Sequence, residues 1–144
     1  MQVTQTNLQK SKLGQQEVSQ KINKFNKNNV PFIYFVQEPM VVNGRPAWQP
    51  NSCKRFGYVN KLIYTDNNSK AWYMESLSGP DITVIQTTIN RKSTLLLSVY
   101  LDINWIQVIP KELHKAMKYA EDKNLGILIA ADTNCHRLIK EGSN

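Results

Sequence analysis

Five polar residues stand at or near the ends of apolar, strand-like runs of this chain. They are Asn7, Glu38, Tyr100, Asp132 and Asn134. Hydrolysis of a phosphodiester with a divalent ion requires a carboxylate that holds the ion and a second acidic group that positions or deprotonates water. It also requires neutral polar groups that bind the phosphate as negative charge develops. Glu38 and Asp132 fit the two carboxylates. Asn7 and Asn134 fit the neutral groups, and the hydroxyl of Tyr100 could act as a donor.

Each of these residues also has a plainer interpretation when it is taken alone. A glutamate after a strand, such as Glu38, can be a solvated turn residue. Asp132 and Asn134 can form an Asx turn or a helix N-cap, where both residue types are favoured. Tyr100 can be a packed aromatic side chain whose hydroxyl reaches the surface. The occurrence of all five in order, at successive strand ends, favours a catalytic site.

The elements that must position these residues follow from hydrophobic periodicity. Helices are predicted at residues 15–27, where Val18, Ile22 and Phe25 share one face, and at 110–124, where a proline begins the helix. Strands are predicted at residues 3–7, 32–36, 58–65, 71–77, 82–90, 94–101 and 126–131. The run at 32–36 is apolar throughout, which is typical of a strand buried on both faces.

The mixture of strands and two helices, with polar residues at strand ends, indicates an α/β layered domain. A chain of 144 residues is the size of one such domain, and residues 1–144 are interpreted as a single domain. In layered α/β folds, chemistry collects at the ends of strands. Residues 38–56 carry three prolines and a glycine without periodicity, so they are predicted to form a long loop that is functional or mobile.

The formal charge of +7 favours an anionic partner, and nucleic acid is the commonest of these. The alternative is a solvated basic surface with no partner. In the predicted loop, Trp48 could stack on DNA, while Arg45, Lys54 and Arg55 could meet phosphates. That loop could equally be a plain surface connection.

No apolar run approaches the ~18–20 residues that a membrane-spanning helix needs, so no membrane partner is expected. The N-terminus lacks the pattern of a signal peptide, and we expect an intracellular protein of the nucleus or cytoplasm. Cys53 and Cys135 are far apart in sequence and are expected to be free thiols.

Several short motifs, taken in order, resemble those of a known family. The motifs are QTNLQKS at 5–11, FVQEP at 35–39, SLSGPDITVI at 76–85, SVYLD at 98–102 and LIAADTNCH at 128–136. Together they resemble the endonuclease domain of non-long-terminal-repeat retrotransposons, a branch of the endonuclease/exonuclease/phosphatase family. The resemblance covers essentially the whole chain.

The resemblance implies a fold, an ion and a role for each site residue. The fold would be the N-terminal part of a four-layer α/β sandwich, with a mixed, largely antiparallel sheet and its helices on one face. Glu38 would be the principal ligand of Mg²⁺ or Mn²⁺, and Asn7 would lie beside the ion. Tyr100 would contact the phosphate, and Asp132 would orient or activate water. Asn134 would hold the phosphate and the nucleophile.

His136 matches a histidine that follows this motif in one branch of the retroelement enzymes. It is a candidate DNA contact, or else a surface histidine. Ala131 stands where the family commonly has glycine. The family's closing Ser-Asp-His element, and the Asp-bearing segment before it, have no counterpart in this sequence. Loss of one member of such a unit commonly costs orders of magnitude in rate.

The resemblance therefore implies an incomplete domain. Parts of the runs at 82–89 and 95–99 would leave a sheet face partly bare, to be covered by self-association or by the C-terminal remainder of the domain. The expected function is metal-dependent hydrolysis of DNA, impaired by truncation. The alternatives are a non-catalytic nucleic-acid-binding remnant and, less favoured by the QEP and DTNCH motifs, an enzyme acting on phospholipids or inositol phosphates.

Overall fold

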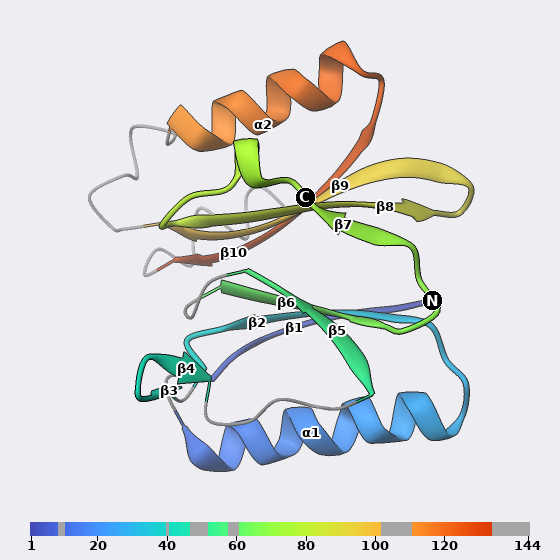
Figure 1. Cartoon of the computed structure of the whole chain (residues 1–144), viewed down its shortest axis with the longest axis vertical. Coiled ribbons are helices and arrows are strands. Elements are labelled where there is room, and N and C mark those ends of the chain that lie inside the picture. The colour runs from blue at the N-terminus through green and yellow to red at the C-terminus, as the bar shows by residue number, and fades with distance from the viewer. Residues whose placement is uncertain (9–10, 40, 47–51, 58–60, 102–110, 134–144) are drawn as a thin grey trace.

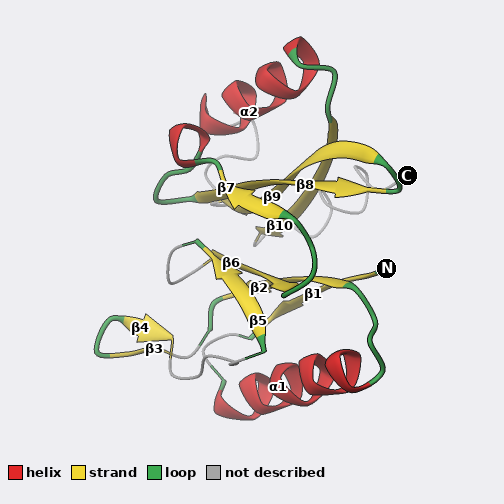
Figure 2. Cartoon of the chain, turned by 45° about the vertical axis from the view of Figure 1, so that its right-hand side comes forward, coloured by secondary structure: helices red, strands yellow, loops and turns green. Residues whose placement is uncertain are grey.

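The computed structural model describes residues 1–8, 11–39, 41–46, 52–57, 61–101 and 111–133. Two four-stranded sheets pack face to face, and each is covered on its outer face by one helix (Figure 1). The turned view in Figure 2 places the two helices on opposite sides of the molecule. The chain is therefore a four-layer α/β sandwich.

The first sheet is formed by the N-terminal half of the chain. Its order is β1 (Gln2–Asn7), β2 (Phe32–Gln37), β6 (Lys61–Asp66) and β5 (Cys53–Phe56). β1 and β2 run parallel, whereas β6 is antiparallel to both of its neighbours. Helix α1 (Lys12–Lys27) is the crossover that a parallel pair requires.

The second sheet has the order β10 (Gly126–Thr133), β9 (Lys92–Leu101), β8 (Ile82–Ile89) and β7 (Ala71–Tyr73). Here β9 and β10 are the parallel pair, and α2 (Lys111–Asp122) lies between them in sequence. A short 3-10 helix, η1 (Glu75–Leu77), leads from β7 toward β8. Each sheet thus carries its parallel pair at one edge.

Helix α1 begins three residues earlier than its apolar period predicts. Ser11 caps it, because the serine Oγ accepts a hydrogen bond from the Gly14 N–H at 3.1 Å. Val18 and Ile22 are buried against the outer face of the first sheet. The capping serine, rather than the apolar face, therefore fixes where the helix starts.

All six residues of β2 are buried, which confirms a strand covered on both faces. Phe32, Tyr34 and Val36 face α1. Ile33 and Phe35 face the second sheet. This alternation follows from the period of two residues along a strand.

The predicted α/β sandwich is confirmed, but two details of its layout differ. The helices cover opposite outer faces rather than one face, and the strands form two sheets rather than one. The expected bare sheet face was wrong, because Ile85 and Leu96 pack against the first sheet and are 0% exposed. The apolar pattern of β8 and β9 indicates that both faces are covered, but it does not say by what.

The predicted long loop at 38–56 was also wrong in part. Residues 41–46 form a hairpin of β3 (Val41–Val42) and β4 (Arg45–Pro46), and β5 joins the first sheet. Asn43 and Gly44 form the hairpin turn with positive φ, which is the usual sequence of a tight two-residue turn. Residues 47–51 lie outside the described part of the chain. Among the described helices, none has the length and apolar character needed to cross a membrane.

Candidate active site

The carboxyl ends of the two parallel strand pairs carry the candidate catalytic residues. In the first sheet, Asn7 lies opposite Gln37, the last residue of β2, and Glu38 follows directly. In the second sheet, Asp132 lies opposite Tyr100. Parallel neighbours have their carboxyl ends at the same end of the sheet. Each sheet therefore carries its own two candidates at one end.

Hydrogen bonds between the sheets bring these two ends together. Gln37 Nε2 donates to the Ala130 carbonyl oxygen at 3.3 Å. Gln5 Nε2 donates to the Ala131 carbonyl oxygen at 3.2 Å and to Gln37 Oε1 at 2.9 Å. Ala131 directly precedes Asp132. The strand ends that carry Asn7, Glu38, Tyr100 and Asp132 therefore lie at the same end of the sandwich.

Glu38 has an unusual backbone conformation. Its φ is +49°, in the left-handed region that residues other than glycine seldom adopt. The side chain is half-buried, and the next residue, Pro39, is buried. Backbone strain of this kind is often found at functional sites, where the surrounding structure holds it in place. The strand therefore ends in a left-handed residue, Glu38, directly before the buried Pro39.

The end of β9 is held by the turn that precedes β8. The Tyr100 N–H donates to the Asp81 carbonyl oxygen at 2.9 Å. Asp81 is the acidic residue that leads into β8, in the segment that resembles the retroelement endonucleases. Its backbone, rather than its carboxylate, makes this contact with Tyr100.

Lys61 is a buried cation of this region that the sequence reasoning missed. It lies opposite Gln37 at the start of β6 and is 2% exposed. Its ammonium donates to the Pro80 carbonyl oxygen. Burial lowers the pKa of Lys61, and the nearby Asp81 opposes that shift. A lysine at the border of an apolar run usually points to solvent, so the sequence carries no clear signal of this burial.

The predicted DNA contacts are spread over the fold. Arg45 is exposed on the β3–β4 hairpin, which projects from the end of the sandwich where Glu38 lies (Figures 1 and 2). Lys54 lies at the far end of the first sheet, where its ammonium donates to the Ser69 carbonyl oxygen at 2.8 Å. Arg55 lies opposite Tyr64, near the middle of β6. The other candidate residues, Trp48, Asn134 and His136, lie outside the described residues.

Glu38 and Asn7 offer oxygen donors of the kind that Mg²⁺ and Mn²⁺ prefer. Among the residues that the structure describes, no group of three or more histidine, cysteine or carboxylate side chains is arranged to hold a metal. Asp132 is described in its backbone only. Mg²⁺ typically keeps several waters and takes only one or two protein carboxylates, so this donor set fits such an ion.

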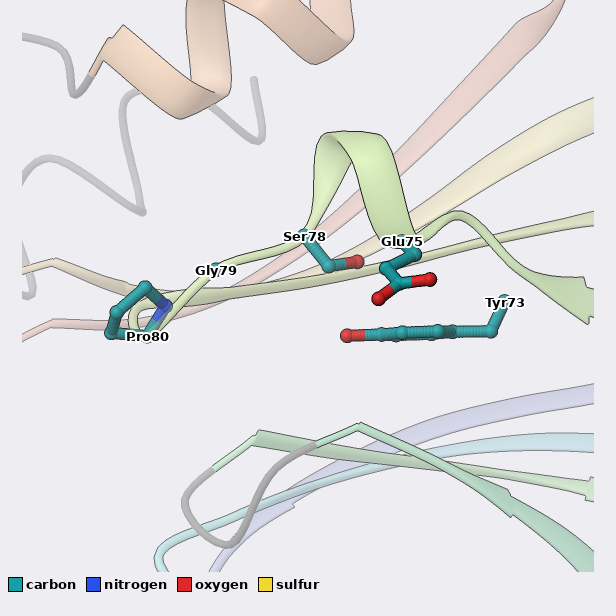
Figure 3. A pocket seen from close by; sticks show the side chains of 5 residues that line it. All are labelled: Tyr73, Glu75, Ser78, Gly79 and Pro80. Atoms are coloured by element: carbon teal, nitrogen blue, oxygen red, sulfur yellow. The ribbon is translucent and has the colours of Figure 1, made fainter.

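An open hollow of about 510 Å³ borders this region on the side of the second sheet. Tyr73, Glu75, Ser78, Gly79 and Pro80 line it. Figure 3 shows the Glu75 carboxylate beside the Tyr73 ring, with Pro80 at the opposite end. The Ser78 hydroxyl is used within the fold, since its Oγ accepts from the Val84 N–H at 3.0 Å.

The fold and its strand-end site define a class of layered α/β domains with a polar site at one end of paired sheets. Among solved structures, the chain is similar to the endonuclease domain of TRAS1, a telomere-specific non-LTR retrotransposon. The two share 22% identity with a TM-score of 0.56, over 90% of this chain and 57% of that chain. At this identity the likeness is one of fold, and in that respect the predicted resemblance is confirmed.

This chain spans little more than half the length of the TRAS1 chain that it matches. No family model and no curated protein matches the sequence.

Proposed function

We propose that this chain carries part of a metal-dependent DNA endonuclease of the retrotransposon type. The observation that carries the proposal is the meeting of two strand-end pairs, Asn7 with Glu38 and Tyr100 with Asp132, at one end of the sandwich. The similarity of its fold to that of a retrotransposon endonuclease domain supports the proposal. The net charge of +7 suits an acidic polymer as substrate.

In the proposed reaction, Glu38 would hold Mg²⁺ or Mn²⁺, and Asn7 would offer a further oxygen donor. When bound, the ion supplies positive charge that stabilises the phosphorane-like transition state. Asp132 accepts a proton from the attacking water as the new phosphorus–oxygen bond forms. The bond to the leaving sugar oxygen breaks, and that oxygen takes a proton from a solvent water. Tyr100 donates a hydrogen bond to a phosphate oxygen, and Asn134 helps hold the phosphate.

DNA binding without hydrolysis is the second candidate. The chain matches only 57% of the TRAS1 chain, so parts of that structure have no counterpart in the match. A partial domain would keep the basic surface and would hydrolyse DNA more slowly or not at all. Arg45 on the hairpin at the site end is the described cation best placed to meet the DNA backbone.

The edges of the two sheets suggest where further chain would pack. Among the described strands, β1 and β10 each lie at the edge of a sheet. Val3, Ile127 and Ile129 are 46%, 39% and 40% exposed. Unpaired edges with exposed apolar residues favour added strands. We propose that further strands of the same domain pack against these two strands. The alternative is a second copy of the chain, which light scattering would detect as a dimer.

A plasmid-nicking assay tests the proposed function. The purified chain is incubated with supercoiled plasmid and Mg²⁺, beside Glu38→Ala. Glu121→Ala serves as the matched control, because Glu121 is exposed in the last turn of α2, near the start of β10 and so at the opposite end of the second sheet from Asp132. Nicking that requires the metal and is lost only in Glu38→Ala supports the endonuclease.

Other outcomes of the same assay point elsewhere. Salt-sensitive DNA binding without nicking supports the binding remnant, since phosphate contacts weaken as salt rises. Release of phosphate from inositol phosphates, with the plasmid intact, contradicts a DNA substrate.

A further inference from the structure

Four polar residues form a buried layer between the sheets, just inside the candidate site. In the first sheet Gln37 lies opposite Lys61, and in the second sheet Thr83 lies opposite Ser98. The two pairs face each other across the sandwich, and each residue is at most 2% exposed. We call Gln37, Lys61, Thr83 and Ser98 the inter-sheet polar layer.

Hydrogen bonds of this layer cross from one sheet to the other. Gln37 Nε2 donates to Ser98 Oγ at 3.5 Å. Thr83 Oγ1 donates to the Lys61 carbonyl oxygen at 2.8 Å. Behind the layer, the sheets meet through apolar residues such as Ile33 and Leu96. Apolar contacts are not directional, whereas hydrogen bonds fix both distance and angle.

One arm of the layer reaches β10. Besides Ser98, Gln37 Nε2 donates to the Ala130 carbonyl oxygen, and its own Oε1 accepts from Gln5. Gln5 also donates to the Ala131 carbonyl oxygen. The backbone of β10 is therefore held to the first sheet immediately before Asp132, through the residue immediately before Glu38.

The other arm reaches the turn before β8. The Lys61 ammonium donates to the Pro80 carbonyl oxygen, at the end of the hollow shown in Figure 3. The next carbonyl, that of Asp81, accepts from the Tyr100 N–H. Lys61 thereby holds the turn on which the end of β9 depends.

Stability alone does not account for such a layer. Burying an ammonium and an amide costs free energy unless both are well paired. Apolar residues of similar volume are often as stabilising in such places, or more so. A polar layer at this position therefore calls for a role that apolar packing could not fill.

We propose that Gln37 and Lys61 are positioning residues. They set the separation between the strand end that carries Glu38 and the strand ends that carry Tyr100 and Asp132. The inference rests on the proposed function and extends it, since neither residue contacts the reacting atoms. Gln37 acts on the Glu38–Asp132 side of the site, and Lys61 acts on the Tyr100 side.

The test compares Gln37→Met and Lys61→Met with Thr65→Val. Thr65 is on the same strand as Lys61 and is equally buried, but it lies toward the other end. Nicking kinetics give kcat, the KM for a duplex oligonucleotide and the Mn²⁺ concentration for half-maximal rate. Electron paramagnetic resonance measures Mn²⁺ binding without activity, and circular dichroism gives the folded fraction.

At equal folded fraction, both methionine variants should lose about 10- to 100-fold in kcat, with an unchanged KM for DNA. Gln37→Met should also raise the Mn²⁺ requirement and weaken Mn²⁺ binding. Lys61→Arg should recover part of the lost rate, because it keeps the charge and the donor. Thr65→Val should match the wild type.

Wild-type kcat and Mn²⁺ binding in folded Gln37→Met and Lys61→Met would overturn the positioning role while leaving the endonuclease intact. A wild-type chain that neither nicks DNA nor binds Mn²⁺ overturns the proposed function and this inference with it. If a methionine variant does not fold, Ser98→Ala and Thr83→Val decide instead. Each removes one crossing bond, so reduced kcat supports the inference and wild-type kcat refutes it.

Discussion

Gln37 Nε2 donates a hydrogen bond to the carbonyl oxygen of Ala130 at 3.3 Å, although the two residues are 93 positions apart in sequence. This contact joins the centre of the first sheet to the edge strand of the second. Glu38 follows the donor directly, and Asp132 lies two residues after the acceptor. The candidate site therefore lies next to hydrogen bonds that join the two sheets.

Tyr100→Phe should lower kcat for plasmid nicking by about 100-fold, because it removes the hydroxyl that the proposed mechanism assigns to the phosphate. The fold should be unaffected, since the Tyr100 contact with Asp81 is made by the backbone. Initial rates under saturating Mg²⁺, with a thermal melt of each protein, test this. An unchanged kcat would remove Tyr100 from the proposed machinery.

Arg45→Ala and Lys54→Ala should differ in their effect on DNA binding. Arg45 is exposed on the hairpin at the site end, whereas Lys54 is bonded to Ser69 at the other end of the first sheet. We expect Arg45→Ala to reduce the slope of log affinity against log salt by about 1, and Lys54→Ala to leave it unchanged. Fluorescence anisotropy over a salt series measures both slopes. Equal slopes in the two variants would argue against this placement of the DNA.

Gly57→Ala should destabilise the protein by about 3 kcal/mol. Gly57 has a φ of +105°, and an added Cβ would lie 2.4 Å from the Lys61 carbonyl oxygen and 2.5 Å from Thr83 Oγ1. Denaturant unfolding measures the change. Gly79→Ala is the control, because a Cβ there meets nothing within 4 Å among the described atoms. A loss in Gly57→Ala no larger than in Gly79→Ala would contradict the close packing.

Cys53 should make the free energy of unfolding depend on pH above about 9. Burial raises the pKa of this thiol from 9.0 to about 12, and the nearby Arg55 opposes the shift. Because the unfolded chain loses the proton first, the contribution of Cys53 to the free energy of unfolding should be constant below pH 9. It should then fall between pH 9 and 12, by at most about 1.4 kcal/mol per unit.

Urea unfolding of the wild type and Cys53→Ser over this pH range isolates the thiol, and the two curves should converge as pH rises. Parallel curves would mean that the thiol is not buried as described. The high pKa also predicts slow alkylation of Cys53 in the folded protein at neutral pH.

The sequence predicted the strand ends that carry the candidate residues better than it predicted the surroundings of those ends. Glu38 and Asp132 follow apolar runs, and the end of a run locates a strand end to within a residue or two. Gln37 and Lys61 were missed because a polar residue at the border of a run looks solvent-exposed. Only the meeting of two sheets, which no local pattern encodes, buries them.

The arrangement of the strands in two packed sheets could not be predicted from the sequence for a related reason. Residues Leu95, Leu96 and Leu97 are all fully buried, but Leu96 faces the other sheet and its neighbours face α2. A run of leucines indicates that both faces of the strand are buried, but it does not show which element packs on each face. The hairpin at 41–46 was missed because each of its strands is only two residues long, too short for any period.

Each sheet is drawn from one continuous stretch of chain, residues 2–66 for the first and residues 71–133 for the second. Every backbone ladder can therefore close within its own half during synthesis, so the first half need not wait for the second to emerge. The candidate site draws residues from both halves, so it is complete only where the two sheets pack together. Closure of either sheet and assembly of the candidate site are therefore separate events, since neither half holds all of the candidate residues.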